Sequence, residues 1–150
     1  MTPSLPTRWC LAAALVAASG SCWAALGEPA AALARVAGTT SVMAQTPAGA
    51  RYTQLTRRLE SGTEVREYAD AAGTVFAVSW SGPFLPDLRA LLGTHFAALE
   101  EHASGVGRAS AVSIQRPEVA ILSGGRMGAF QGRAWLPRQL PAGFDPRAVP

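Results

Sequence analysis

Two histidines, His95 and His102, are the residues best suited to proton transfer or metal binding in this sequence, because an imidazole does both near neutral pH. They lie seven residues apart in a segment with a helical pattern. A helix places such a pair on nearly one face but about 10 Å apart along its axis, whereas a shared metal needs a spacing of three or four residues. We therefore expect neither a metal site nor a bound cofactor.

Motifs for covalent or phosphate chemistry are missing. No serine stands in a Gly-x-Ser-x-Gly turn, which exposes the nucleophile of many hydrolases. The run GGRMG at 124–128 lacks the lysine and the following helix of a phosphate-binding loop. One enzymatic alternative stays open: a small hydrolase or isomerase that uses an Asp or Glu carboxylate and His95 in a pocket. A buried carboxylate within hydrogen-bond reach of His95 would favour it.

Aromatic residues gather between residues 65 and 93, around a sharp corner in the chain. Pockets lined by aromatic side chains and a few charges are typical sites for small molecules. Trp80 and Phe84 would form the walls of such a groove, with neighbouring charges as polar contacts. The alternative is packing around a tight strand-to-helix turn. The candidate residues for binding a ligand or partner are Arg66, Glu67, Tyr68, Trp80, Gly82, Pro83, Phe84, Asp87 and Arg89.

Three segments with strand patterns lead to this corner. Residues 52–60, 64–70 and 75–80 are separated by short turns that contain glycine, which is typical of an antiparallel meander. In the third segment, alternation places Phe76, Val78 and Trp80 on one face. That apolar face needs a covering element.

A helix is expected after the corner, over about 86–104. Pro86 suits the first helical position, and Asp87 just inside it favours the helix dipole. The apolar residues that repeat with the helical period are Leu88, Leu91, Leu92, Phe96, Leu99 and Ala103. We expect this stripe to pack on the aromatic face of the meander. The predicted fold class is α+β: an antiparallel sheet with one amphipathic helix on one face.

The remaining segments suggest one domain with two extensions. Shorter strands are expected at 109–115, 119–123 and 127–136, with Gly124 and Gly125 as the turn between the last two. The predicted domain spans 51–137. An Ala-rich arm at 25–50, either ordered or flexible, precedes it, and residues 39–44 suit a short edge strand. A Pro-rich tail at 138–150 follows it.

Residues 1–24 have the order of a secretory signal peptide. Arg8 is their one charge, residues 11–18 form an apolar run too short to span a bilayer, and Ala24 precedes the expected cleavage site. Cleavage would remove both cysteines, leave no transmembrane segment, and deliver the chain to the periplasm or the outside of the cell. The alternative is a lipoprotein anchored through Cys22, since residues 19–22 faintly resemble a lipobox.

The charge pattern excludes nucleic acid as a partner. All 13 basic residues are arginines, and the formal net charge is +3. Around the densest basic cluster, at 57–58, four acidic residues between 60 and 70 largely cancel it. Nucleic-acid binding needs a patch of one sign.

Several stretches resemble a known family. They are VREY at 65–68, GTVFAVSWSGPFLPDL at 73–88, SGGRMGAFQGRAWLP at 123–137 and LPAGF at 140–144. These are similar to domain-of-unknown-function family 2844, a family of exported proteobacterial proteins. The resemblance covers most of 25–145 and is strongest over 64–93. It implies export and a shared fold, and it supplies no activity, cofactor or catalytic residue. We therefore expect an exported binding or structural module, with an unidentified protein or small molecule as partner. An exposed aromatic patch without titratable partners would favour binding.

Overall fold

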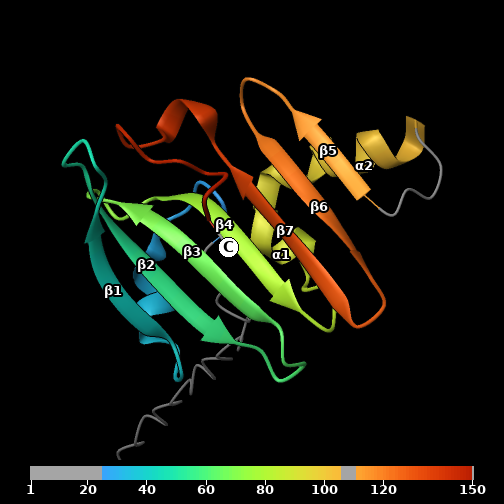
Figure 1. Cartoon of the computed structure of the whole chain (residues 1–150), viewed down its shortest axis with the longest axis horizontal. Helices are drawn as coiled ribbons and strands as arrows, with labels where there is room; N and C mark the ends of the chain where they lie inside the picture. Colours follow the sequence, from blue (N-terminus) through green and yellow to red (C-terminus); the bar gives the residue numbers. More distant parts are fainter. Residues whose placement is uncertain (1–24, 106–110, 150) are drawn as a thin grey trace, which may run out of the picture.

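The computed structural model describes residues 25–105 and 111–149, so the predicted signal peptide and the first residues of the strand expected at 109–115 lie outside the described residues. A seven-stranded antiparallel sheet with the order β1-β2-β3-β4-β7-β6-β5 forms the centre (Figure 1). Its strands are β1 (Thr40–Gln45), β2 (Arg51–Arg58), β3 (Glu64–Asp70), β4 (Val75–Gly82), β5 (Ala111–Gln115), β6 (Ala120–Arg126) and β7 (Ala129–Trp135). The meander and the α+β class are confirmed.

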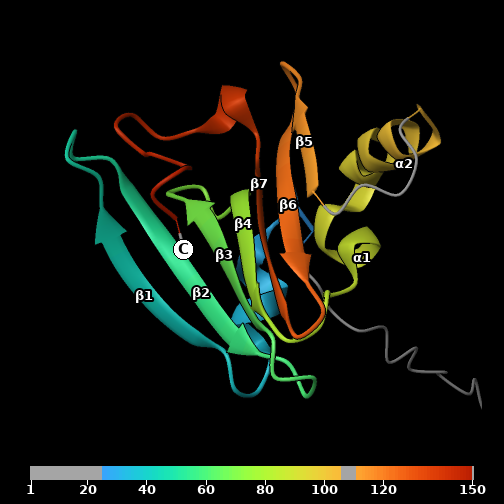
Figure 2. The ribbon, with the colours of Figure 1, turned by 45° about the vertical axis from the view of Figure 1, so that its right-hand side comes forward.

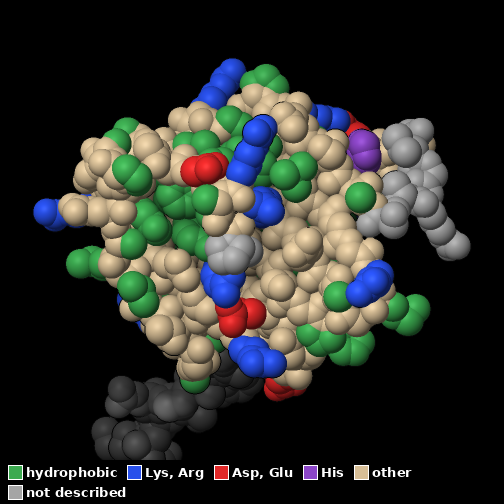
Figure 3. Space-filling view, in the orientation of Figure 1, with side chains coloured by type: hydrophobic (Ala, Val, Ile, Leu, Met, Phe, Trp, Pro, Cys, Tyr) green, Lys and Arg blue, Asp and Glu red, His purple; other side chains and the backbone are tan. Residues whose placement is uncertain are grey.

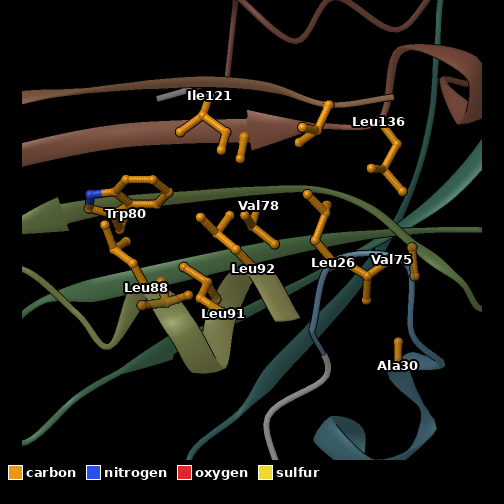
Figure 4. Close-up of a cluster of buried hydrophobic side chains, with 14 of the residues drawn as sticks. Leu26, Ala30, Val75, Val78, Trp80, Leu88, Leu91, Leu92, Ile121 and Leu136 are labelled. Atoms are coloured by element: carbon orange, nitrogen blue, oxygen red, sulfur yellow. The ribbon is translucent and has the colours of Figure 1, made fainter. Parts of the chain in front are cut away.

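The helical segment covers one face of the sheet, which we call the helix face. It consists of α1 (Leu88–Leu92), a 3-10 turn η2 (Gly93–His95) and α2 (Phe96–Gly105), and a second 3-10 segment, η1 (Ala30–Arg35), lies on the same side (Figure 2). Leu88, Leu91 and Leu92 are buried against Val78 and Trp80 in one core (Figure 4). The predicted packing on the meander is therefore confirmed for the first half of the stripe, whereas Phe96 and Leu99 are only partly buried and Ala103 is exposed.

The helix starts later than predicted and breaks in the middle. Asp87 is the N-cap, because its carboxylate accepts a hydrogen bond from the backbone N–H of Ala90 at 3.0 Å. Gly93 has a φ of +56°, and a Cβ at this position would lie 2.7 Å from the Cβ of Ala25. The chain thus bends at Gly93, where the N-terminal segment passes closely.

Phe76 lies on the opposite face from the one that simple alternation predicts. The β3–β4 ladder pairs Tyr68 with Ala77 and Ala69 with Val75, which leaves Phe76 as an extra residue. Such a β-bulge changes the direction of the side chains that follow it. Val75 therefore joins Val78 in the core of the helix face, and the prediction for Phe76 is wrong.

The second face of the sheet carries its own apolar cluster, and we call it the tail face because the C-terminal segment crosses it (Figure 1). Phe76 and Tyr68 are buried there, and Phe144 from the tail packs edge-on against Phe76 with ring centres 4.8 Å apart. Phe76 therefore gives the C-terminal segment an aromatic surface against which it packs.

The last hairpin turns three residues later than predicted. Gly124 and Gly125 lie within β6, and the turn between β6 and β7 is formed by Met127 and Gly128. A Cβ at Gly125 would lie 2.4 Å from the carbonyl oxygen of Ala129. Gly125 thus allows β6 and β7 to approach each other closely, and it is not part of the turn.

Residues 25–50 contribute to both the core and the sheet. Leu26, Ala30 and Leu33 are buried in the core of the helix face. Strand β1 forms one edge of the sheet, next to β2. Within residues 25–105 and 111–149, none of the helices has the length and apolar character required to cross a membrane.

Candidate functional site

The corner between β4 and α1 is fastened by Thr63, which is fully buried at the β2–β3 turn. Its hydroxyl donates to the carbonyl oxygen of Phe84 at 2.6 Å and accepts from the backbone N–H of Phe84 at 3.3 Å. Gly82 permits this approach, because a Cβ there would lie 2.5 Å from the Cα of Thr63. The backbone of Phe84 is therefore fixed while its side chain stays outside.

Large apolar side chains are exposed at this corner. Phe84 and Leu85 are 61% and 48% exposed, and Met127, at the tip of the neighbouring β6–β7 hairpin, is 96% exposed. Gly82 pairs with Phe130 across β4 and β7, which holds the corner beside that hairpin. Hydrophobic side chains gather at the same lower right side of the molecule in Figure 3.

A groove of about 410 Å³ opens between the corner and the hairpin. Residues 81–83 form one wall and residues 128–131 the other. The lining carries no charged side chain: it consists of two glycines, a serine, a glutamine, an alanine, Pro83 and Phe130. We call this groove, with exposed Phe84, Leu85 and Met127, the corner patch.

Asp87 and Arg89 flank the corner but already have roles in the fold. Asp87 caps α1. The guanidinium of Arg89 lies over the Phe96 ring, 4.5 Å from its centre, and pairs with Glu100. Arg89 therefore ties α1 to α2, and neither residue lines the groove.

Trp80 lies in the core and is 1% exposed. Figure 4 shows its indole between the sheet and α1, above Leu88. A Cβ at Gly132 would lie 2.3 Å from a carbon of this indole, so the ring occupies the space beside the glycine. Trp80 is thus a packing residue and no wall of the corner groove.

Glu67 also points to the helix face, where it is 1% exposed. Its neighbours across the strands are Leu55 and Val78, and a guanidinium nitrogen of Arg57 is 3.9 Å from its carboxylate. Burial raises the pKa of Glu67 to about 7, although the Arg57 charge opposes this shift. The side chain of Glu67 is therefore buried beneath the helix face and does not line the corner groove.

Arg66 and Tyr68 lie on the tail face, away from the corner. Arg66 forms an ion pair with Glu64. Tyr68 is buried beside Tyr52 and Phe144, and this burial raises the pKa of its hydroxyl. Of the nine residues predicted to bind, the structure brings Gly82, Pro83 and Phe84 together and distributes the other six over the corner's flank, the core and the tail face.

The two histidines lie in the helical segment, His95 in η2 and His102 in α2. The Nε2 atom of His95 would be 3.6 Å from a Cβ at Gly27, so the imidazole faces the N-terminal segment. In the part of the chain that the structure describes, no carboxylate is hydrogen-bonded or ion-paired to His95. The same residues hold no group of three or more His, Cys, Asp or Glu side chains suited to a metal.

Sequence reasoning missed Met127 and Leu85 as surface residues. Met127 was assigned to a strand because two adjacent glycines are a common hairpin signal. An apolar residue directly before Gly128 was the available sign of an exposed turn tip, since turns usually carry polar residues. Leu85 follows Phe84 between two prolines, where no periodic pattern assigns it a face.

A family model described as "Protein of unknown function (DUF2844)" matches residues 22–149. The match covers every helix and strand described above and confirms the resemblance found in the sequence. No curated protein and no solved structure gave a significant match to the chain.

Proposed function

The chain belongs to the DUF2844 family, and we propose that this member is an exported, non-catalytic binding protein whose corner patch docks an apolar segment of a polypeptide partner. The observation that carries the proposal is the exposure of Phe84, Leu85 and Met127 around one uncharged groove. Contiguous exposed apolar side chains commonly mark interaction surfaces, whereas single ones are ordinary.

The groove suits a polypeptide better than a charged small molecule. Its lining offers no side-chain charge to orient a charged ligand. Glycines 82 and 128 leave backbone groups accessible beside the apolar side chains, and a polypeptide presents both types of group together. The flexible thioether of Met127 can adapt to the side chain that it meets.

The fixed backbone at the corner also favours binding. Thr63 holds Phe84 through two hydrogen bonds, and strand pairing holds the hairpin opposite. A preorganised surface loses little conformational freedom when a partner docks. The enzymatic alternative has no comparable support, because His95 lacks a carboxylate partner among the described residues.

Export is part of the proposal and rests on the sequence. Arg8, the apolar run at 11–18 and the small residues before Ala25 follow the order of a cleavable signal. We infer that the partner is met in the periplasm or at the cell surface. Anchoring through Cys22 is the alternative mode of delivery.

The test compares serine substitutions inside the corner patch with a serine substitution of an exposed methionine outside it. A photoreactive residue at Leu85 is used to cross-link the exported protein in cells, and the captured partner is purified for direct binding measurements. We expect Phe84→Ser and Met127→Ser to raise the Kd for this partner about ten-fold or more, as loss of a central contact does. Met43→Ser, which removes an 83% exposed methionine on edge strand β1, should leave the Kd within about two-fold.

Three results would contradict the proposal. One is an equal loss of affinity in Met43→Ser and Met127→Ser. Another is a cross-linked product that contains only a second copy of this chain. The third is a patch that binds phospholipid vesicles while no polypeptide is captured.

A further inference from the structure

A separate pocket of about 300 Å³ lies between the tail face and the C-terminal segment, at the other end of the sheet from the corner patch. It brings together the turn after β1, the first part of β2, the end of β3 and residues 143–149. We call it the tail pocket. The lining residues that matter here are Tyr52, Gln54, Tyr68, Phe144 and Asp145.

The roof of the tail pocket is held in place by contacts on both sides. The hydroxyl of Thr46 donates to the carbonyl oxygen of Ala142 at 2.6 Å and accepts from the backbone N–H of Ala50 at 3.1 Å. Arg133 donates to the carbonyl oxygen of Arg147. The tail is therefore attached to the β1–β2 turn at one end and to β7 at the other.

Three aromatic rings form the apolar side of the pocket. The ring centre of Tyr52 lies 6.2 Å from that of Tyr68 and 5.3 Å from that of Phe144, and the last two are 5.6 Å apart. Two of these contacts are edge-on. Aromatic rings carry negative charge on their faces and attract cations there.

Asp145 is the charged residue in the described lining, which contains no arginine or histidine. Its carboxylate accepts one hydrogen bond, from the backbone N–H of Arg147 at 2.9 Å, and it makes no ion pair with any residue in the described ranges. Figure 3 shows an acidic side chain between hydrophobic and basic side chains where the tail crosses the sheet. The pocket thus combines neutral aromatic surface with one negative charge.

We propose that the tail pocket binds a small organic cation, an ammonium group that contacts the partly exposed rings of Tyr52 and Phe144 and pairs with Asp145. A metal ion does not fit this chemistry, because hard cations require six or more oxygen ligands and the pocket offers one carboxylate. Asp145 is exposed, so its carboxylate is accessible to a positively charged ligand.

The test compares two probes of equal shape in the purified protein. Choline and its uncharged analogue 3,3-dimethyl-1-butanol differ in the positive charge, and binding is followed by chemical-shift changes of backbone amides. We expect choline to shift the amides of the tail pocket saturably and to bind at least about ten-fold more tightly than the analogue. Sodium chloride at equal concentration should not reproduce these shifts.

Variants separate recognition from folding. Asp145→Asn and Tyr52→Leu should each weaken choline binding about ten-fold or more, while Tyr52→Phe, which keeps the ring, should bind like the native protein. Glu60→Gln removes one exposed negative charge at the far end of β2 and should have no effect. Amide spectra that match outside the pocket show that each variant is folded.

Equal binding of choline and the analogue would overturn the proposal, as would shifts that Asp145→Asn does not change. Shifts centred on the corner patch would do so as well. Because the two surfaces are separate, Met127→Ser should not alter choline binding, and a failure at one site leaves the other testable.

Discussion

Glu67 is a carboxyl that the fold holds in apolar surroundings. Its cross-strand neighbours are Leu55 and Val78, and burial raises its pKa from 4.5 to about 7 despite the nearby Arg57. In the unfolded chain the group ionises near its ordinary value. The folded state therefore binds the proton more tightly than the unfolded state does.

This difference predicts the direction of the pH dependence. Between pH 4.5 and about 7 the folded chain holds a proton that the unfolded chain has lost, so the free energy of unfolding should fall as the pH rises. The full effect would be roughly 3 kcal/mol. Denaturant unfolding of the native protein and of Glu67→Gln across this range measures it.

The glutamine variant should lose most of this slope, because an amide does not titrate. Both histidines are present in both proteins, so the difference between the two curves isolates Glu67. Parallel curves would show that the carboxyl ionises normally in the folded state.

Glu67 lies on the same side of β3 as Val65 and Ala69, as the alternation of side chains along a strand requires. What alternation does not report is which side of a strand becomes covered. Glu67 was therefore taken for a polar contact at the corner, although it lies beneath the helix face. For Trp80, alternation gives the correct face, which the helix covers, and the expectation of a groove wall is the part that does not hold.

At the scale of elements, the contact between β4 and β7 depends on the fit of Trp80 over Gly132. A Cβ at Gly132 would lie 2.3 Å from the indole and 2.7 Å from the carbonyl oxygen of Leu122. Gly132→Ala should lower the free energy of unfolding by about 1–3 kcal/mol, as overpacking does. Thermal or denaturant unfolding measures this change.

A double-mutant cycle tests the cause. Trp80→Phe removes the part of the ring that faces Gly132, together with an indole nitrogen that has no hydrogen-bond partner in the described part of the chain. The cost of Gly132→Ala should be smaller in the Trp80→Phe background than in the native protein. Additive costs would mean that the backbone, and not the ring, resists the alanine.

The sequence predicted the elements better than their details. Alternation located β2, β3 and β4, and the helical period located the segment after the corner. Each pattern reflects the burial of one side of the element. The bulge at Phe76 breaks the period through pairing with β3, and local residues do not announce it. Gly93, where the helix breaks, lies beside Ala25, which approaches from another part of the chain.

At the scale of the whole molecule, the two proposed surfaces lie at opposite ends of one sheet. The corner patch is built from β4 and the β6–β7 hairpin, and the tail pocket from β2, β3 and the C-terminal segment. The sequence suggested the first through its cluster of aromatics. It gave no sign of the second, because Tyr52, Tyr68 and Phe144 meet only after the tail folds across the sheet.

The proposed export makes the start of the mature chain a feature of the whole molecule. Leu26 is 2% exposed, and its N–H donates to the carbonyl oxygen of Leu91 at 3.0 Å, so a core residue lies two positions after the expected cleavage site. We expect mass spectrometry of the protein recovered from outside the cytoplasm to give a chain that begins at Ala25. Cleavage after Leu26 would remove a buried residue from the core, so we do not expect a shorter chain.

Lipidation provides the contrasting outcome. A chain that begins at a diacylated Cys22 would be heavier by three residues and the lipid, and it would attach the fold to a membrane through a short linker. Cys22→Ser would then release the protein from the membrane fraction, whereas cleavage after Ala24 predicts no change in its distribution. The same fractionation shows whether the corner patch meets its partner free in solution or close to a lipid surface.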